Sequence, residues 1–165
     1  MTATVSELFP DLEPELAATR RVLERVPFDQ WDWKPHDKSY SLGRLATHLA
    51  ELPSFAQIIA MEDELDLGAT PYRSPNIGDI GELLALFDRT SASFRQALAT
   101  LDGSRLAAHW KLRMGDTPIF EAPRSLLLRQ HGISHPAHHR AQLGVYLRLL
   151  GIPVPGVYGP SADEM

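Results

Sequence analysis

The stretch PRSLLLRQHGISHPAHHRAQLGVYLRLLG, residues 123–151, has the pattern of one long amphipathic helix. Proline fits the first turn of a helix, where its missing N–H costs nothing, and glycine is favoured directly after the last turn. Pro123 therefore predicts the start of this helix, and Gly151 predicts its end. Helical periodicity places one stripe of side chains on a single face, and leucine at both ends predicts that this face points inward. The stripe comprises Leu128, His135, His139, Gln142, Tyr146 and Leu149.

Three earlier segments show the same helical periodicity. The first covers residues 11–26 and stops before a proline, which cannot continue a helix. The second begins at Ser41, a good N-cap, and contains Pro53, which should bend the helix or end it early. The third begins at the capping-box sequence DIGE, residues 79–82, and ends at residues 102–103.

The segments between these helices differ in length and character. Residues 28–40 form an irregular connection whose tryptophans are expected to cover one end of the helices. Residues 66–78 form a polar loop, and Gly115 followed by Asp116 predicts a short β-hairpin before the last helix. We therefore predict an all-α fold, a four-helix bundle with a long crossover connection, in which residues 1–165 form one domain.

The composition is that of a globular, acidic chain without cysteine. Its 165 residues are 44% hydrophobic and 22% charged, with a formal net charge of −5. The chain has no cluster of lysine and arginine, which nucleic-acid binding requires, so the expected partner is a small-molecule substrate. The absence of cysteine excludes disulfides, thiolate metal ligands and a cysteine nucleophile. Any thiol chemistry would therefore use a thiol brought by the substrate or cofactor.

Two features lead us to expect a cytoplasmic protein that does not enter the membrane. Residues 1–14 carry three acidic side chains and lack the basic start and apolar run of a signal peptide. In addition, no segment approaches the roughly 20 apolar residues needed to span a bilayer.

Histidine is unusually frequent, and four of the seven histidines lie in the nine-residue stretch from His131 to His139. His135 and His139 are four positions apart, which places both imidazoles on one face of a helix. This spacing offers two nitrogen ligands to a single ion.

His48 lies among leucines of the second helix and is expected to face the same interior. A lone histidine there would normally be a hydrogen-bonded core residue. Three neutral imidazoles that converge in an apolar interior are difficult to satisfy by hydrogen bonds alone, whereas a divalent ion accepts all three lone pairs. We therefore predict a metal site formed by His48, His135 and His139.

Other polar side chains are expected around this site. Glu51, one turn beyond His48, is either a catalytic carboxylate or a solvated charge at the helix edge. Gln142, one turn beyond His139, is expected to act in catalysis by orienting a histidine rather than by binding the metal. His131 is expected to lie beside the ligands. The remaining histidines, expected to be surface or packing residues, are His36, His109 and His138.

Three neutral ligands leave the site doubly positive and keep a coordination position open for water or substrate. The ion could lower the pKa of a bound water or thiol, or polarise a carbonyl, and the residues do not choose among these. A thiol cofactor would be held as thiolate by such a site. Arg140 and Tyr146 are predicted to bind that cofactor, and the alternative for Arg140 is a surface charge.

Several segments resemble those of the DinB/YfiT-like family. HPAHHRAQL (residues 135–143) and YLRLLGIPVP (residues 146–155) resemble its C-terminal signature. WKP (residues 33–35) and LATHLA (residues 45–50) resemble its other recurrent segments, so the resemblance covers most of the chain. It implies a four-helix bundle, often dimeric, with one divalent ion held by three histidines. The matching residues here are His48, His135 and His139, and the implied metal is nickel or zinc, sometimes manganese or iron.

The resemblance also implies a kind of reaction. Some members of the family are thiol-dependent transferases that use glutathione, bacillithiol or mycothiol, and many have no assigned activity. Two residues depart from the family pattern. Pro136 stands where an acidic or polar residue is common and should kink the turn that presents both ligands. Ala141 replaces a common glycine, which suggests slightly wider helix packing there.

Three functions are open at this point. The first is a thiol-dependent S-transferase that forms a homodimer. The second is a metal-dependent hydrolase, in which Glu51 would act as base on a metal-bound water. The third is a non-catalytic metal-binding bundle, in which the histidines serve stability or sensing.

Overall fold

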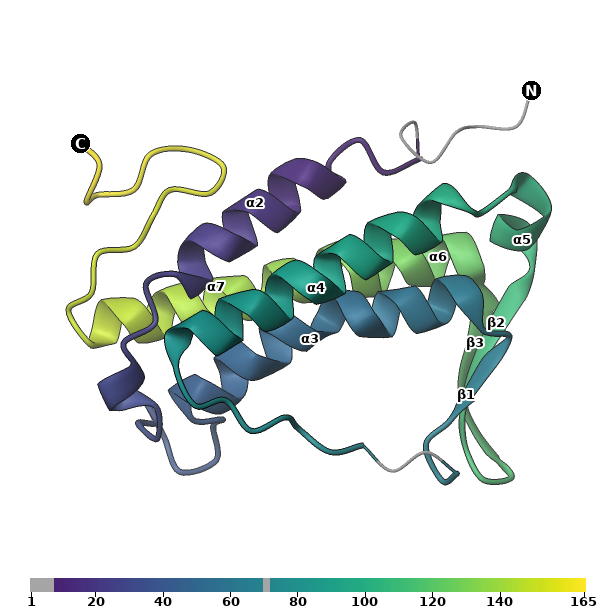
Figure 1. Cartoon of the computed structure of the whole chain (residues 1–165), viewed down its shortest axis with the longest axis horizontal. Helices are drawn as coiled ribbons and strands as arrows, with labels where there is room; N and C mark the ends of the chain where they lie inside the picture. The colour runs from purple at the N-terminus through teal and green to yellow at the C-terminus, as the bar shows by residue number, and fades with distance from the viewer. Residues whose placement is uncertain (1–7, 70–71) are drawn as a thin grey trace.

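The helices of the protein lie side by side, with a small β-sheet at one end (Figure 1). The computed structural model describes residues 8–69 and 72–165. Its helices are α2 (Leu12–Leu23), α3 (Leu42–Met61), α4 (Ile80–Ala99), α5 (Gly103–Ala107), α6 (Arg124–Arg129) and α7 (His135–Leu149), with a 3-10 turn η1 (Phe28–Gln30) and a π-helical turn η2 (Gln130–Ser134). Its strands are β1 (Glu64–Asp66), β2 (His109–Met114) and β3 (Thr117–Pro123). The predicted all-α fold is therefore corrected to a mainly helical fold with a three-stranded sheet.

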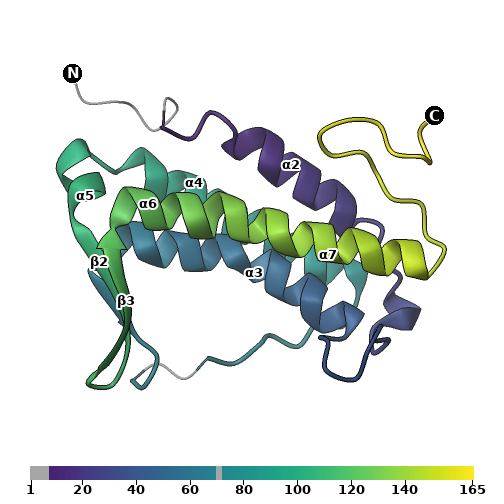
Figure 2. The same cartoon turned by 180° about the vertical axis from the view of Figure 1, so that it is seen from behind.

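α3 is the central helix, because it packs against α4 on one side and against α6, η2 and α7 on another. α2 contacts both α4 and α7, and Figure 2 shows α6 and α7 forming one continuous rod alongside α3. The leucines and isoleucine of the α3 core face are at most 3% exposed: Leu42, Leu45, Leu49, Leu52 and Ile59. Within the described ranges, no helix has the length and hydropathy to cross a bilayer.

The predicted N-cap of α3 is present, and the preceding loop completes it. Ser41 Oγ accepts a hydrogen bond from the Arg44 N–H at 3.2 Å. The two preceding N–H groups of the helix donate to the carbonyls of Trp33 and Trp31, both at 2.8 Å. The first N–H groups of a helix have no partner within it, so the connection between α2 and α3 satisfies them. This loop is therefore a structural cap of α3.

Pro53 does not end α3, which continues without interruption to Met61. A proline lacks the N–H that would bond the carbonyl one turn earlier, so the helix is weakest at this point. Close by, the Thr90 hydroxyl of α4 donates to the Ala50 carbonyl at 2.7 Å. Packing against α4 thus supports α3 around its proline, and the early end allowed for by the sequence does not occur.

The last helix differs from the prediction at its start and in its middle. Pro123 is the N-cap of α6 rather than its first residue. Gly151, with φ at +72°, follows the C-cap of α7 as predicted. Between α6 and α7 the helix contains the π turn η2. A π turn holds one residue more than an α turn, so it rotates all later residues by about 100° around the helix axis.

This rotation changes which face of α7 is buried. The inward stripe predicted for this part of the helix was His135, His139, Gln142 and Tyr146. The buried residues are instead Pro136, Arg140, Leu143 and Leu147, each one position further along the chain. Leu149, predicted to point inward, is 62% exposed. His135 and His139 are half-buried, so the two histidines lie on the flank of the core face rather than at its centre.

The predicted hairpin is present, and a third strand joins it. β2 and β3 pair antiparallel, and Gly115 takes a positive φ of 57° in the turn between them. β1 pairs parallel with β2, where Arg113 donates to Glu64 and Asp66 at 2.6–2.9 Å. A strand of three residues is too short to show an alternating pattern, which is why the sequence did not reveal β1.

The packing of Trp31 on α3 makes Gly43 a position where no side chain fits, because a Cβ there would overlap the indole ring. We expect Gly43→Ala to lower the free energy of unfolding by about 1–3 kcal/mol, since overpacking displaces the loop that caps α3. Denaturant unfolding followed by tryptophan fluorescence measures this change.

Gly144→Ala in α7 is the matched control. Its Cβ would meet only Val154, at an ordinary contact distance of 3.6 Å. Because the substitution removes the entropic cost of glycine in a helix, it should raise the free energy of unfolding by roughly 0.5–1 kcal/mol. Equal effects of the two substitutions would contradict the packing assigned to Trp31.

Candidate metal centre

Three histidines from two helices converge where α3 and α7 meet. His48 lies on α3, and His135 and His139 lie in the first turns of α7. One nitrogen from each of the three rings lies within 4.8 Å of the others. The Nε2 atoms of His135 and His139 face each other at 2.9 Å. The structure therefore brings together the three residues selected from the sequence, in a group that could hold a metal ion.

The donor geometry fits a divalent ion after small side-chain rotations. Metal–nitrogen bonds of about 2.0–2.1 Å in a tetrahedral site place the ligand nitrogens roughly 3.3 Å apart. The separation of 2.9 Å within α7 is slightly shorter than this. Two imidazole nitrogens at that distance need a proton or a cation between them, because two lone pairs repel each other. An ion shared with His48 would meet this requirement.

The π turn before α7 decides where these two rings emerge. The His135 N–H donates to the Gln130 carbonyl, five residues earlier, which closes η2. Pro136 then falls in the first turn of α7, where a missing N–H is tolerated. The kink expected from Pro136 is thus taken up by the π turn directly before it. Pro136 is itself buried, so it lies on the core face of α7.

All three imidazoles are held in the neutral form that binds metal. Burial lowers the pKa of His48 to about 4, with smaller contributions from His139 and the positive charge of Arg44. Burial also lowers the pKa of His135 to about 4, with contributions from the neighbouring histidines. The pKa of His139 is lowered by burial and partly restored by its bond to Gln142. Near pH 7 their lone pairs are therefore free of protons.

Gln142 orients one of the three rings. Its Oε1 lies 2.7 Å from His139 Nδ1, and because an amide oxygen only accepts, this nitrogen must carry the proton. The lone pair of His139 is thereby placed on Nε2, the atom that faces His135. This is the arrangement in which an outer hydrogen bond fixes the tautomer of a metal-binding histidine. Gln142 therefore contacts a histidine of the group, and its role in catalysis stays a prediction.

Glu51 lies one turn beyond His48 on α3 but does not belong to the histidine group. Its carboxylate accepts a hydrogen bond of 2.6 Å from the Tyr72 hydroxyl, and it lies 3.7 Å from Arg44. Burial raises the pKa of Glu51, opposed by the Tyr72 bond and the Arg44 charge. The carboxylate is thus half-buried and engaged with other side chains, rather than a solvated charge at the helix edge.

Arg140 is placed differently from the prediction. Its side chain is only 3% exposed, and it forms an ion pair of 2.7 Å with Glu15 of α2. The guanidinium also donates to the Thr19 hydroxyl at 3.2 Å and to the Tyr158 hydroxyl at 2.6 Å. These contacts occupy it between α2 and the C-terminal segment, so it is neither a surface charge nor free to bind a cofactor. The one-residue register shift in α7 is the reason for this correction.

Tyr146 remains half-buried next to the loop before α3. Its hydroxyl donates to the Tyr40 carbonyl at 3.3 Å, and its ring meets Trp33 edge-on with 5.6 Å between the ring centres. The side chain therefore links the end of α7 to the loop that caps α3. Cofactor binding by Tyr146 stays a prediction.

The other histidines lie outside the three-residue group. The His131 ring stacks on Phe120 at 5.5 Å and meets Phe55 edge-on at 5.1 Å. It lies 5.7 Å from the His135 ring, beside the ligands as expected. The exposed histidines are His36, His109 and His138.

Sequence analysis missed three side chains near the centre: Tyr40, Arg44 and Tyr72. The Tyr40 ring lies 6.2 Å from the His48 ring, and Arg44 precedes His48 by one helical turn. The spacing of four residues between Arg44 and His48 was a usable signal, because it puts both on one face of α3. The approach of Tyr72 from a distant loop left no mark in the sequence.

A sequence model of the DinB family matches residues 1–165. The chain belongs to the DinB family. This match confirms the resemblance carried by the histidine segment of α7 and by the shorter segments before it. As a DinB-family protein, it shares the arrangement of its helices with solved members of the same group.

Three relatives illustrate the relationship. YrdA, an uncharacterized protein of Bacillus subtilis strain 168, is 26% identical over 164 residues, which covers 99% of this chain and 93% of YrdA. A DinB-like protein from Bacillus cereus ATCC 10987 has a similar structure, with a TM-score of 0.70 and 21% identity over 96% of this chain and all of that chain (100%). The DinB-like protein YjoA of Bacillus subtilis has a TM-score of 0.67 and 19% identity. The match covers 88% of this chain and 95% of that chain. The likeness to these two structures is one of fold.

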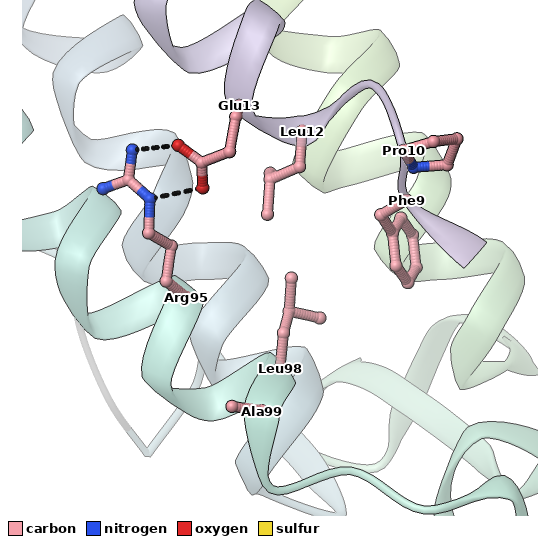
Figure 3. A pocket seen from close by; sticks show the side chains of 7 residues that line it. All are labelled: Phe9, Pro10, Leu12, Glu13, Arg95, Leu98 and Ala99. Atoms are coloured by element: carbon pink, nitrogen blue, oxygen red, sulfur yellow. Dashed lines mark hydrogen bonds and ion pairs between the residues drawn. The ribbon is translucent and has the colours of Figure 1, made fainter. Parts of the chain in front are cut away.

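The groove drawn in Figure 3 is separate from the histidines. It lies between the start of α2 and the end of α4 and is mainly apolar. Its charged residues, Glu13 and Arg95, bond each other at 2.6 and 2.8 Å, so they leave no unpaired charge facing the groove. The histidine group lies elsewhere, at the junction of α3 and α7.

Loss of an outer-shell partner of a metal ligand lowers metal affinity roughly 10–100-fold. We expect a larger loss of affinity for each of His48→Ala, His135→Ala and His139→Ala. Gln142→Ala should lower the affinity by an amount within that range, because it removes only the hydrogen bond that fixes the tautomer of His139. Metal titration of untagged protein, with metal content measured by mass spectrometry, gives both values.

His109→Ala is the matched control for these variants. Its ring is exposed on β2 and contacts Glu121 at 3.3 Å, so its removal should leave metal content unchanged. Full occupancy in the His135→Ala protein would overturn the assignment of the site.

Proposed function

We propose that this DinB-family protein is a metal-dependent enzyme whose divalent ion is held by His48, His135 and His139. The proposal includes a four-helix bundle, with α2, α3, α4 and the rod formed by α6 and α7 as its four members. The observation that carries it is the pair of Nε2 atoms at 2.9 Å, with Gln142 fixing the tautomer of one ring. Imidazole ligands suit nickel and zinc, which are the metals we propose.

We propose a thiol-dependent transferase as the reaction type. Three neutral ligands leave a doubly positive ion with an open position, which favours an incoming anion over a neutral ligand. When bound, the ion would lower the pKa of a thiol from its ordinary value of about 8.5, so that the thiolate predominates near pH 7. The chain has no cysteine, so the thiol belongs to a cofactor such as glutathione, bacillithiol or mycothiol.

In this reaction the sulfur of the cofactor forms a bond to an electrophilic atom of the substrate, whose leaving group departs with its electron pair. The thiol proton must be accepted as the thiolate forms. Glu51 is the proposed acceptor, because burial raises its pKa toward neutrality and it lies one turn from His48. The Tyr72 hydroxyl, bonded to Glu51 at 2.6 Å, holds that carboxylate in place. Tyr146 is the proposed contact for the cofactor on α7.

The placement of Glu51 also favours a second candidate, a metal-dependent hydrolase. A half-buried carboxylate with a raised pKa suits a general base that takes a proton from water. The two candidates use the same side chains and differ in the nucleophile, which is a thiol in one and water in the other. The nucleophile can therefore be identified by experiment.

We expect metal-loaded protein to convert an electrophilic substrate only when a thiol is added, because the chain supplies none. The assay compares turnover with glutathione, bacillithiol, mycothiol and no thiol. His139→Ala should lower thiol-dependent turnover to the level of the reaction without protein. Glu51→Gln should lower turnover by about 10²–10⁴-fold, the usual contribution of a general base, with metal content unchanged.

Other outcomes of this assay point to the other functions. Metal-dependent turnover that is indifferent to every thiol contradicts the transferase and supports the hydrolase. Metal binding without turnover of any substrate in a broad panel supports a non-catalytic metal-binding protein instead.

We also propose a homodimer formed through the outward face of α7. Val145 and Leu149, one turn apart, are 58% and 62% exposed, and Ala141 extends the same stripe by another turn. A helix with apolar residues on both its inner and outer faces is typical of one that is covered on both sides.

Light scattering at micromolar concentration should therefore give a dimer mass for the wild type and a monomer mass for a Val145→Glu, Leu149→Glu double variant. Met114→Glu is the control, since Met114 is 50% exposed at the far end of the β2–β3 hairpin. A monomer mass for the wild type would rule the dimer out.

A further inference from the structure

Arg44 lies at the edge of the histidine group, in the first turn of α3. It precedes His48 by four residues, so their Cβ atoms are about 5–6 Å apart on one helix face. Its positive charge is close enough to contribute to the lowered pKa of His48. The reactions proposed above give Arg44 no task.

Two tyrosine rings lie next to this guanidinium. The Arg44 Cζ lies 5.2 Å from the centre of the Tyr40 ring and 5.5 Å from the centre of the Tyr72 ring. Cation–π contacts of this kind hold the group in one orientation without using its N–H donors. The N–H groups of the guanidinium therefore remain available to bind a ligand.

The N–H donors of this guanidinium are largely unused among the described residues. One long bond of 3.4 Å reaches the Ser74 hydroxyl, and Glu51 lies 3.7 Å away, beyond hydrogen-bond distance. Three other arginines behave differently. Arg95, Arg129 and Arg148 each make two bonds of 2.6–3.0 Å to a single carboxylate. Arg44 is half-buried, and its ion pair with Glu51, at 3.7 Å, is longer than the bonds of those three arginines.

A purely structural role would make Arg44 a clamp that holds the segment between β1 and α4 against α3. Figure 1 shows the part of this segment from residue 72 to residue 79 running below α3. However, Tyr72 is already fastened to α3 by its bond of 2.6 Å to Glu51. A clamp would also gain from short hydrogen bonds to the segment, whereas among the described residues Arg44 makes a cation–π contact with Tyr72 and one long bond to Ser74. The N–H groups of Arg44 are therefore better placed to bind a ligand than to hold the segment.

We infer that Arg44 binds a carboxylate of the molecule that occupies the open metal position, so that this molecule is held at two points. The inference rests on the proposed metal-dependent function and names the chemical class of its ligand. A planar carboxylate matches the guanidinium edge and can accept two parallel bonds from it. A phosphate dianion fits less well, because the Glu51 carboxylate lies beside the same edge and would repel a second negative charge. The ligand is a monoanionic carboxylate with its metal-binding group about one helical turn away.

The test uses cobalt-loaded protein and two thiols that differ only in the distal group, mercaptobutyrate and mercaptobutyramide. Thiolate binding to cobalt gives an absorption band, whose titration yields a Kd for each thiol. We expect the wild type to bind the acid about tenfold more tightly than the amide, the size of one charge-assisted hydrogen bond. In Arg44→Met this preference should fall to about twofold or less, with the Kd of the amide and the cobalt content unchanged.

Two further variants separate recognition from charge. Arg89→Met makes the same change in net charge at an exposed position of α4, and it should keep the tenfold preference. Arg44→Lys keeps the charge but loses the planar edge, so it should retain only part of the preference.

The inference is overturned if wild-type protein binds acid and amide equally, if it binds neither, or if the preference survives in Arg44→Met. Survival in that variant would mean that the carboxylate contacts the ion itself. A loss of thermal stability in Arg44→Met with an unchanged preference would identify the clamp. Protein that takes up no cobalt overturns the proposed function together with this inference, and metal analysis of the same samples distinguishes that result from the others.

Discussion

The π-helical turn η2 sets the rotational position of every residue in α7. Its extra residue moves the buried stripe from His135 and His139 to Pro136 and Arg140. Without this turn both imidazoles would point into an apolar core with no route for a ligand. With it, they lie half-buried on the flank, next to His48. Gly132 allows the turn to pack closely, because the Phe94 ring occupies the space that a side chain at that position would need.

α3 provides the rigid side of the same centre. Its core face is leucine-rich, and its neighbouring edge carries Arg44, His48 and Glu51 at spacings of four and three residues. The helix is held at both ends. The loop that contains Trp31 and Trp33 caps its start. Near its end, the buried Arg124 donates to the Ile59 and Glu62 carbonyls at 2.6 and 2.7 Å. Side chains on a helix fixed in this way keep their relative positions, which a metal site requires.

Two adjacent residues of α7, His139 and Arg140, lie in different electrostatic environments. His139 lies among other neutral imidazoles and is kept neutral by burial, whereas the adjacent Arg140 is buried against Glu15 of α2. Both side chains were candidates for the same site when only their spacing was known. Their directions differ by about 100°, so the helix register alone places one in the histidine group and the other in the core.

The sequence by itself determined the positions of the long helices, the cap at Ser41, the hairpin at Gly115 and the three histidines, because each leaves a local signal of spacing or residue type. It also determined that no thiol is supplied by the chain. Only the tertiary structure decided the π turn, the strand β1, the burial of Arg140 and the approach of Tyr72 to Glu51. The physical reason is that these features depend on contacts between residues far apart in the chain, such as Glu15 with Arg140 and Glu64 with Arg113. Such contacts impose no periodic pattern on the sequence.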